Sequence, residues 1–457
     1  MSSPLATAGR RRTRAPLIWS SLVFALVAIA PRASAAELPA PSDAQLADSL
    51  DRATVVRAAV ARSPWVKAAD QRARAVGVAA DAEGRLPPPE AMVQVWQVPI
   101  TRPYAVTDAQ MIMLGVAQSF PSPGSRGARQ AARTEGAHVE EAMARDRARM
   151  VARDAEHAFA DYVEAVARHR VHLAHRDIGT RVFGLAQARY AAGGSLVEVT
   201  QAEAELARVI ADVVTDAARI RTARARINAL LARDPRAPLG DPTFGEPLMP
   251  SLSLEAALVR ARAERPVLRA AEAFRGARGH ELRAADREAT WPSFSVAGLY
   301  FAPTSPMPQH GYGVNASMSL PWIWGAAGRR RDAQQLELEA AGTQIEAERI
   351  AVETEVVTAD ANSRSAALRL QVLRDRALPA SRRAFDASWA GYESARTDLL
   401  NVQSARRALV DAEEGIVMAR AALDHALAEL DAAVGASVPR VSLGALPADA
   451  LGGDHAL

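Results

Sequence analysis

The chain contains no cysteine, and this absence excludes several kinds of site. With no cysteine among its 457 residues it has no disulfide, no thiol nucleophile and no thiolate metal ligand. After residue 35 no apolar run approaches the roughly 18 residues that a membrane-spanning helix needs, so we expect no such helix there. The sequence also has no nucleophile–base pairing, phosphate-binding loop or zinc signature, so we expect neither enzymatic activity nor a cofactor.

Proline is missing from three long stretches, residues 124–234, 322–378 and 380–438. Because proline is the strongest breaker of a helix interior, these stretches favour long helices. Apolar residues recur within them at three- and four-residue steps, and residues 199–230 approach a heptad pattern, which is typical of helices that pack along a narrow seam. Pro379, between the last two stretches, should kink or restart its helix.

The net charge of +3 comes from the first 35 residues. This segment has five arginines and no acidic residue, whereas the rest of the chain has 50 basic and 52 acidic residues. We therefore expect no nucleic-acid partner. Four of the arginines precede an apolar run at 16–30 and the cleavage motif Ala33-Ser34-Ala35. This order predicts a cleaved secretory signal peptide, the alternative being a retained membrane anchor.

Four short segments, 91–98, 110–119, 294–301 and 312–320, break the helical pattern and are expected to be extended. The last of them alternates strictly in polarity. Its larger apolar residues Tyr312, Val314, Ala316, Met318 and Leu320 alternate with Gly313, Asn315, Ser317 and Ser319. Such a period of two predicts a strand with two unlike faces, of which the small, polar one would line a lumen.

The strand pairs fall at equivalent places in an internal repeat of about 200 residues. Pro121 and Pro321, which follow the second strand of each pair, are 200 residues apart, and Tyr190 and Tyr392 are 202 apart. The following division is therefore expected. It comprises a signal peptide at 1–35, a first repeat at 36–250, a second repeat at 251–437 and a tail at 438–457. The first repeat has a helix, strand pair 91–119 and long helices 125–232, and the second has a helix, strand pair 292–321 and long helices 326–437.

Four strands of about ten residues fit the length of a tilted strand in a membrane. Four strands cannot close a barrel, however, and lipid does not tolerate an open sheet edge. Three copies would supply 12 strands. We thus predict a mainly helical fold with membrane β-structure, in which long antiparallel helical hairpins form an α-barrel and four strands per chain join a trimeric 12-stranded transmembrane β-barrel. The alternative is a soluble protein with two buried hairpins.

Four short motifs lie where strands meet helices and where long helices meet each other. Phe120–Arg126 and Leu320–Trp322 are at the first kind of place, and Ala188–Gly193 and Tyr392–Gln403 are at the second. These motifs resemble those of the outer-membrane efflux proteins of the TolC type, and most of all its heavy-metal branch, which is CzcC- and CusC-like. The resemblance covers nearly the whole chain after the leader.

The resemblance implies a homotrimer in the cell outer membrane, in contact with its lipid, with helices in the periplasm. It implies that the chain is the channel subunit of a tripartite RND-type efflux system, with a periplasmic adaptor (membrane fusion) protein and an inner-membrane RND pump as partners. By analogy with the branch, the exported substrates would be heavy-metal cations. Two alternatives stay open: a duct for drugs, organic solutes or type I secretion, and a non-conducting periplasmic coiled-coil adaptor or scaffold.

The resemblance also suggests roles for residues at the junctions and turns. The strand-to-helix junctions would be formed by Pro121, Pro123, Gly124 and Pro321. Adaptor hairpins would dock at the helix turns, near Tyr190, Gly193, Tyr392 and Ala395. Because Ala395 stands where glycine is usual, we expect a differently shaped turn there. Asp398 and Asn401 would lie at a pore constriction, where three aspartates attract cations; the alternative for Asp398 is an ordinary aspartate at a helix start.

Two groups of residues have the chemistry of metal ligands. The first consists of His169, His172 and His175, spaced three apart on a helix. Three neighbouring arginines disfavour a bound cation, so we expect these histidines to be solvated or to face a partner. The second consists of Met111, Met113, Met307 and His310 in the strand pairs. A path for soft metals is conceivable there, but we expect ordinary barrel and loop residues and no metal site.

Overall fold

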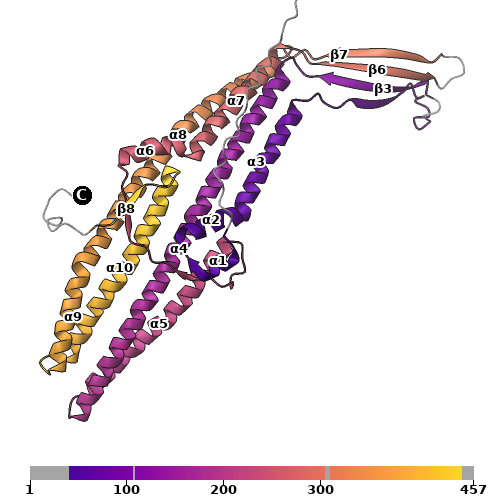
Figure 1. Ribbon diagram of the computed structural model, residues 1–457. Helices are drawn as coiled ribbons and strands as arrows, with labels where there is room; N and C mark the ends of the chain where they lie inside the picture. Colours follow the sequence, from indigo (N-terminus) through magenta and orange to yellow (C-terminus); the bar gives the residue numbers. More distant parts are fainter. Residues whose placement is uncertain (1–40, 106–108, 304–308, 445–457) are drawn as a thin grey trace, which may run out of the picture. The chain divides into compact units, whose positions relative to one another are not determined.

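The proline-free stretches form the longest helices of the computed structural model, which describes residues 41–105, 109–303 and 309–444. In the first stretch α4 (Ser125–Ala191) and α5 (Leu196–Leu230) form an antiparallel hairpin (Figure 1). With 67 residues, α4 is about 100 Å long. The predicted signal peptide and residues 445–457 of the predicted tail lie outside the described residues.

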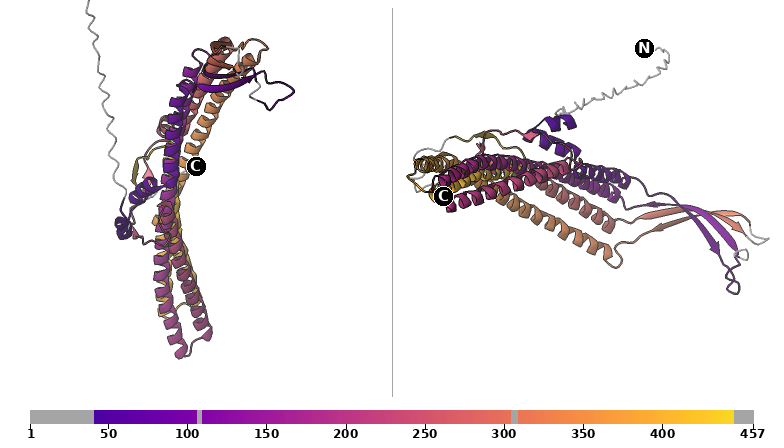
Figure 2. Two further views of the ribbon diagram at one scale, coloured as in Figure 1. Left: turned by 90° about the vertical axis from the view of Figure 1, so that its right-hand side faces the viewer. Right: turned by 90° about the horizontal axis from the view of Figure 1, so that it is seen from below.

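The second repeat builds its hairpin from three helical segments. α8 (Ala326–Val372) continues through the π-helical turn η2 (Leu373–Ala377) into α9 (Leu378–Glu393), and α10 (Leu399–Val434) returns beside them (Figure 1, Figure 2). Pro379 lies in the first turn of α9, so the helix restarts there as predicted. A proline has no N–H to donate, and the wider turn before it accommodates the lost helical bond.

Shorter helices precede the long ones in each half. They are α1 (Asp43–Asp48), α2 (Arg52–Arg62) and α3 (Pro64–Glu83) in the first half, and α6 (Leu254–Glu264) and α7 (Pro266–Thr290) in the second. Both α3 and α7 begin with a proline, which suits a first helical position because no hydrogen bond is needed there. No helix in the described ranges is long and apolar enough to cross a lipid bilayer.

The four predicted strands pair in one antiparallel sheet. Its strands are β2 (Glu90–Trp96), β3 (Met111–Phe120), β6 (Phe294–Pro303) and β7 (Gly311–Met318), in the order β2-β3-β6-β7. The pairing of β3 with β6, which starts at Phe120 opposite Phe294, joins the two repeats. The right-hand view of Figure 2 shows these strands as a twisted ribbon beyond the ends of the helices.

Two small pairs of strands tie loops to the helices. β1 (Ser49–Leu50) pairs in parallel with β4 (Asp241–Pro242), and β5 (Leu248–Pro250) pairs antiparallel to β8 (Arg440–Ser442). Near the first pair lies a core around the fully buried Tyr162, whose hydroxyl donates to the carbonyl oxygen of Gly240 at 3.0 Å. The core is divided into separate clusters along the helices, and many of its members are alanines.

Candidate functional site

One face of the four-stranded sheet is apolar and exposed. Directly paired residues of neighbouring strands point to the same side, so the register assigns the face. Its exposed apolar members are Val93, Val95, Leu114, Val116, Phe120, Phe294, Val296, Tyr300, Tyr312, Val314 and Met318. Water-soluble monomers rarely expose a continuous apolar surface of this kind.

The opposite face of the sheet is mixed. In β7 it carries Gly313, Asn315 and Ser317, as predicted, but β3 and β6 add Met113 and Phe301. A Cβ on Gly313 would lie 2.7 Å from the Phe301 ring, so the ring needs the space that glycine leaves. Met307 lies outside the described residues. Within the described residues, no group of three or more histidine, aspartate or glutamate side chains could hold a metal ion.

The strand-to-helix junctions lie where the motifs predicted them. Gly124 has a φ of +82°, in the left-handed region that favours glycine, and it immediately precedes α4. Pro121 and Pro123 flank Ser122, whose hydroxyl donates to the Trp291 carbonyl oxygen at 2.8 Å. In the second repeat Pro321 begins the corresponding link from β7 to α8, and Gly325 precedes that helix with a φ of +68°.

The two helix turns have the same hydrogen-bond pattern. In the first, the N–H of Gly193 donates to Tyr190 O at 2.9 Å; in the second, the N–H of Ala395 donates to Tyr392 O at 3.0 Å. Ala395 has a φ of +57°, so it adopts the left-handed conformation that Gly193 has at +98°. The expectation of a differently shaped turn is therefore wrong. An alanine in this conformation costs about 1 kcal/mol relative to glycine.

Tyr392 connects the two helical hairpins. It is fully buried, and its hydroxyl donates to Glu198 Oε2 of α5 at 3.0 Å. The guanidinium of Arg189, from α4, lies 4.2 Å from the Tyr392 ring centre. Burial raises the pKa of Tyr392. Its side chain is therefore an internal contact and is unavailable to a docking partner, whereas Tyr190, Gly193 and Ala395 are exposed.

Asp398 is the N-cap of α10. Its Oδ1 accepts a hydrogen bond from the N–H of Asn401 at 3.0 Å, and both residues are exposed. An aspartate in this position satisfies one of the free N–H groups at a helix start. In the single chain, Asp398 thus acts as an ordinary aspartate at a helix start, which was the alternative to a pore constriction.

A polar seam, formed by His172, His175, Asp216, Glu413 and Glu414, lies between α4, α5 and α10. His172 is buried, with Nδ1 2.5 Å from Asp216 Oδ2 and Nε2 3.0 Å from Glu414 Oε1. His175 is buried with Nε2 2.9 Å from Glu413 Oε2. The hydrogen bond from His175 lowers the pKa of Glu413 despite burial. For His172 and His175 the expectation of a solvated or partner-facing role is wrong, because they join helices within the chain; His169 is half-buried and has no ion pair in the described part of the chain.

A second contact of this kind lies further along the same helices. His425 of α10 places Nε2 2.9 Å from Asp161 Oδ1 of α4, and its ring stacks on that of His157 at 4.6 Å. The hydrogen bond to Asp161 raises the pKa of His425. Burial, followed by the charge of His425, lowers the pKa of His157. The negative groups Glu164 and Asp424 also act on His425.

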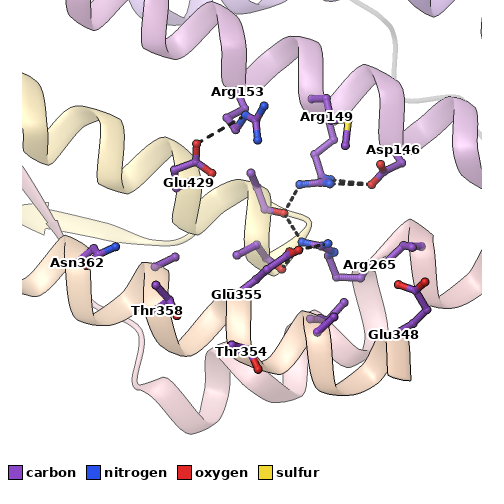
Figure 3. A pocket seen from close by; sticks show the side chains of 17 residues that line it. Asp146, Arg149, Arg153, Arg265, Glu348, Thr354, Glu355, Thr358, Asn362 and Glu429 are labelled. Atoms are coloured by element: carbon purple, nitrogen blue, oxygen red, sulfur yellow. Dashed lines mark hydrogen bonds and ion pairs between the residues drawn. The ribbon is translucent and has the colours of Figure 1, made fainter. Parts of the chain in front are cut away.

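A cavity of about 570 Å³ lies between α4, α8, α10 and the start of α7 (Figure 3). Arg149 and Arg265 point from α4 and α7 toward the same end of α10. Arg265 donates to the Ala432 and Ala433 carbonyl oxygens, both at 3.0 Å, and Arg149 also donates to Ala432. The last carbonyl groups of a helix carry partial negative charge, which the arginines balance. The cavity is therefore a structural joint between the repeats.

Residues 257–436 match the family model described as outer membrane efflux protein. This matched segment lies in the second half of the chain, so the family likeness at the sequence level covers only that part. The match agrees with the predicted resemblance to outer-membrane efflux proteins and does not distinguish the heavy-metal branch. No curated protein sequence matches the chain.

Solved structures extend the likeness in fold to most of the chain. It is similar to the outer-membrane channel OprN, with 21% identity, a TM-score of 0.70, and 84% of this chain and 89% of that chain covered. VceC of Vibrio cholerae has 18% identity, a TM-score of 0.69 and coverages of 84% and 96%. CusC has 17% identity, a TM-score of 0.71 and coverages of 84% and 92%. The predicted mainly helical fold with four strands per chain is thus confirmed.

Replacing His425 should give a destabilisation that depends on pH. A histidine whose folded-state pKa is raised stabilises the fold fully below its unfolded pKa of about 6.5, and this contribution is lost as the pH rises through the folded-state value. His425→Gln should therefore lower the thermal midpoint of the helical circular dichroism signal more at about pH 6 than at about pH 9. His157, which shifts the opposite way, stays in both proteins.

The matched control is His138→Gln on α4, since the His138 side chain is half exposed. It should change the midpoint little at either pH. An equal loss for His425→Gln at both pH values would contradict a charged contact between His425 and Asp161.

Proposed function

We propose that this chain is one subunit of a trimeric outer-membrane duct that exports solutes in a tripartite efflux system. The helices would lie in the periplasm, and the partners would be a periplasmic adaptor protein and an inner-membrane RND pump. The proposal rests on the apolar exposed face of the sheet, together with the outer membrane efflux protein family of residues 257–436. Lipid is the environment that removes such a face from water.

The unpaired edge strands of the sheet support the proposal of a trimer. β2 and β7 are the outer strands in the order β2-β3-β6-β7, so each has one side without a partner in the described part of the chain. In lipid, unpaired backbone groups are costly, and closure with other copies removes both edges. Three copies would make 12 strands, an even number within the range of known barrels.

The helix turns are the proposed docking region for the adaptor. Tyr190, Gly193 and Ala395 are exposed there and belong to two hairpins that Tyr392 holds together. An adaptor that touched both turns would therefore meet one preorganised surface. Preorganisation lowers the entropic cost of binding.

Heavy-metal cations are the proposed cargo. The support is the motif at Phe120–Arg126, which resembles the strand-to-helix junction of the heavy-metal branch. A strain that lacks the protein should become sensitive to copper, zinc or cobalt salts. Sensitivity to drugs alone would overturn the metal assignment and favour organic solutes, with the duct itself unaffected.

The two faces of β7 allow a matched test of the duct. Val314 lies on the apolar face and its neighbour Asn315 on the other. Val314→Arg should prevent assembly into the outer membrane, because an arginine facing lipid near the bilayer centre costs about 2–4 kcal/mol. Asn315→Arg should still assemble, run on an unboiled gel as a trimer, and alter single-channel conductance in a planar bilayer.

Equal tolerance of both substitutions would contradict a lipid-facing sheet. A wild-type protein that fractionates away from the outer membrane and conducts no ions would instead favour the non-conducting scaffold.

Asp398 is proposed to contribute to a constriction as well as to cap α10. Asp398→Asn keeps a good helix cap and removes the charge, whereas Asp398→Ala removes both. If three aspartates narrow the pore and attract cations, both variants should raise leak conductance and reduce cation selectivity. Asp386→Ala, an exposed change on α9, is the control. Wild-type conductance and selectivity for Asp398→Asn would reject the constriction and leave only the cap.

A further inference from the structure

The link between β7 and α8 presents two tryptophans to the outside. The exposed fractions of Trp322 and Trp324 are 56% and 98%, and Ile323 between them is also exposed. Trp324 has a φ of +79°, a left-handed conformation that is unusual for a bulky residue. An almost fully exposed indole in a strained conformation adds nothing to the packing of its own chain. Its position is therefore explained better by a contact outside the chain.

Three consecutive arginines follow the tryptophans. Arg329, Arg330 and Arg331 lie in the first two turns of α8 and are exposed. The start of a helix carries partial positive charge, so arginines here are unfavourable for the helix itself. Arg331 pairs with its neighbour Asp332 at 3.0 Å, whereas in the described part of the chain Arg329 and Arg330 have no ion pair. Two positive charges are thus available to an external anion.

The corresponding link of the first repeat is different. Between β3 and α4 the chain has no tryptophan, and Ser122 is buried with its hydroxyl bound to the Trp291 carbonyl oxygen. The first link is therefore packed against its own chain. Only the second combines exposed indoles with free guanidinium groups.

The tryptophans lie next to the end of the apolar sheet face. Phe120, Phe294 and Met318 are paired across the three strands in the last row of that face, and Trp322 follows Met318 by four residues. Along this direction the surface changes from apolar side chains to indoles and then to arginines. A phospholipid leaflet changes in the same order, from acyl chains to headgroups. Tryptophan prefers the headgroup region, and arginine binds phosphate through paired N–H groups.

We propose that the segment 321–331, the junction anchor, binds the anionic phospholipid surface on the helical side of the membrane. Trp322 and Trp324 lie among the headgroups, and Arg329 and Arg330 bind lipid phosphate groups. The anchor rests on the proposed function, which puts the sheet in lipid. Charge complementarity and continuity with the apolar face favour lipid over a second copy of the chain as its occupant.

Two measurements on the full-length trimer test the anchor. In liposomes whose lipids carry bromine close to the headgroups, tryptophan fluorescence should be quenched in a Trp96→Phe/Trp291→Phe background, which removes the two other half-exposed tryptophans at the ends of the sheet. Adding Trp322→Phe/Trp324→Phe to this background should lose most of that quenching. In detergent, phosphatidylglycerol should raise the thermal midpoint of the trimer more than phosphatidylcholine does. Arg329→Gln/Arg330→Gln should lose this difference, whereas Arg349→Gln/Arg369→Gln, two exposed arginines further along α8, should keep it.

Three results would overturn the anchor. They are quenching that the phenylalanine variants retain, equal effects of the two lipids on the wild-type trimer, and disulfide cross-linking of Trp324→Cys between subunits, which would assign the segment to the interface of copies. All three leave conductance and trimer formation intact and so leave the duct standing. A wild-type protein that forms no trimer and inserts into no liposome would defeat the proposed function itself.

Discussion

The apolar face and free edges of the four-stranded sheet constrain the rest of this protein. The face needs an apolar environment, and the edges need backbone partners that its own strands do not supply. Both needs are met if copies join their sheets edge to edge with lipid around them. The glycine links at Gly124 and Gly325 then determine how the long helices leave each strand, so the arrangement of the helices depends on the sheet.

The helices are held together by small residues and by scattered polar contacts. Alanine lets helix backbones approach closely, but its small side chain fits equally well in several alignments of two packed helices and so does not specify one of them. Contacts such as His172 with Asp216 and Glu414, or His425 with Asp161, exist in only one alignment of α4 with its neighbours. The buried polar groups therefore contribute to the choice of register, a role known for such groups in coiled coils.

Much of the fold could be predicted because the decisive signals are local. Missing prolines indicate α4, α8 and α10, and alternating polarity indicates β7. A helix before each strand pair was also expected, but the two-residue strands were not predicted, since β1 and β4 depend on contacts between distant segments.

The dependence on contacts between distant segments also explains why the roles of some site residues were predicted wrongly. His172 and His175 meet partners 44 and 238 residues away, and the spacing of histidines on one helix carries no information about those partners. Tyr392 was assigned to a docking surface because it adjoins a turn. Its ring packs in a cluster with Val182 and Ala202, and its hydroxyl donates to Glu198, all about 190–210 residues away. Ala395 was misjudged because residue type alone does not reveal that the surrounding turn imposes a left-handed backbone.

The π-helical turn η2 has a consequence for the rotational phase of the helix that contains it. One residue in excess of a regular turn rotates everything beyond it by about 100° around the axis. Before η2, α8 packs through Val352 and Val356 against α6 and α10; beyond it, α9 directs Tyr392 at Glu198. An uninterrupted α-helix with these residues would have turned that ring away from α5. One extra residue thus allows a single continuous helix to pack against two neighbours that lie in different directions.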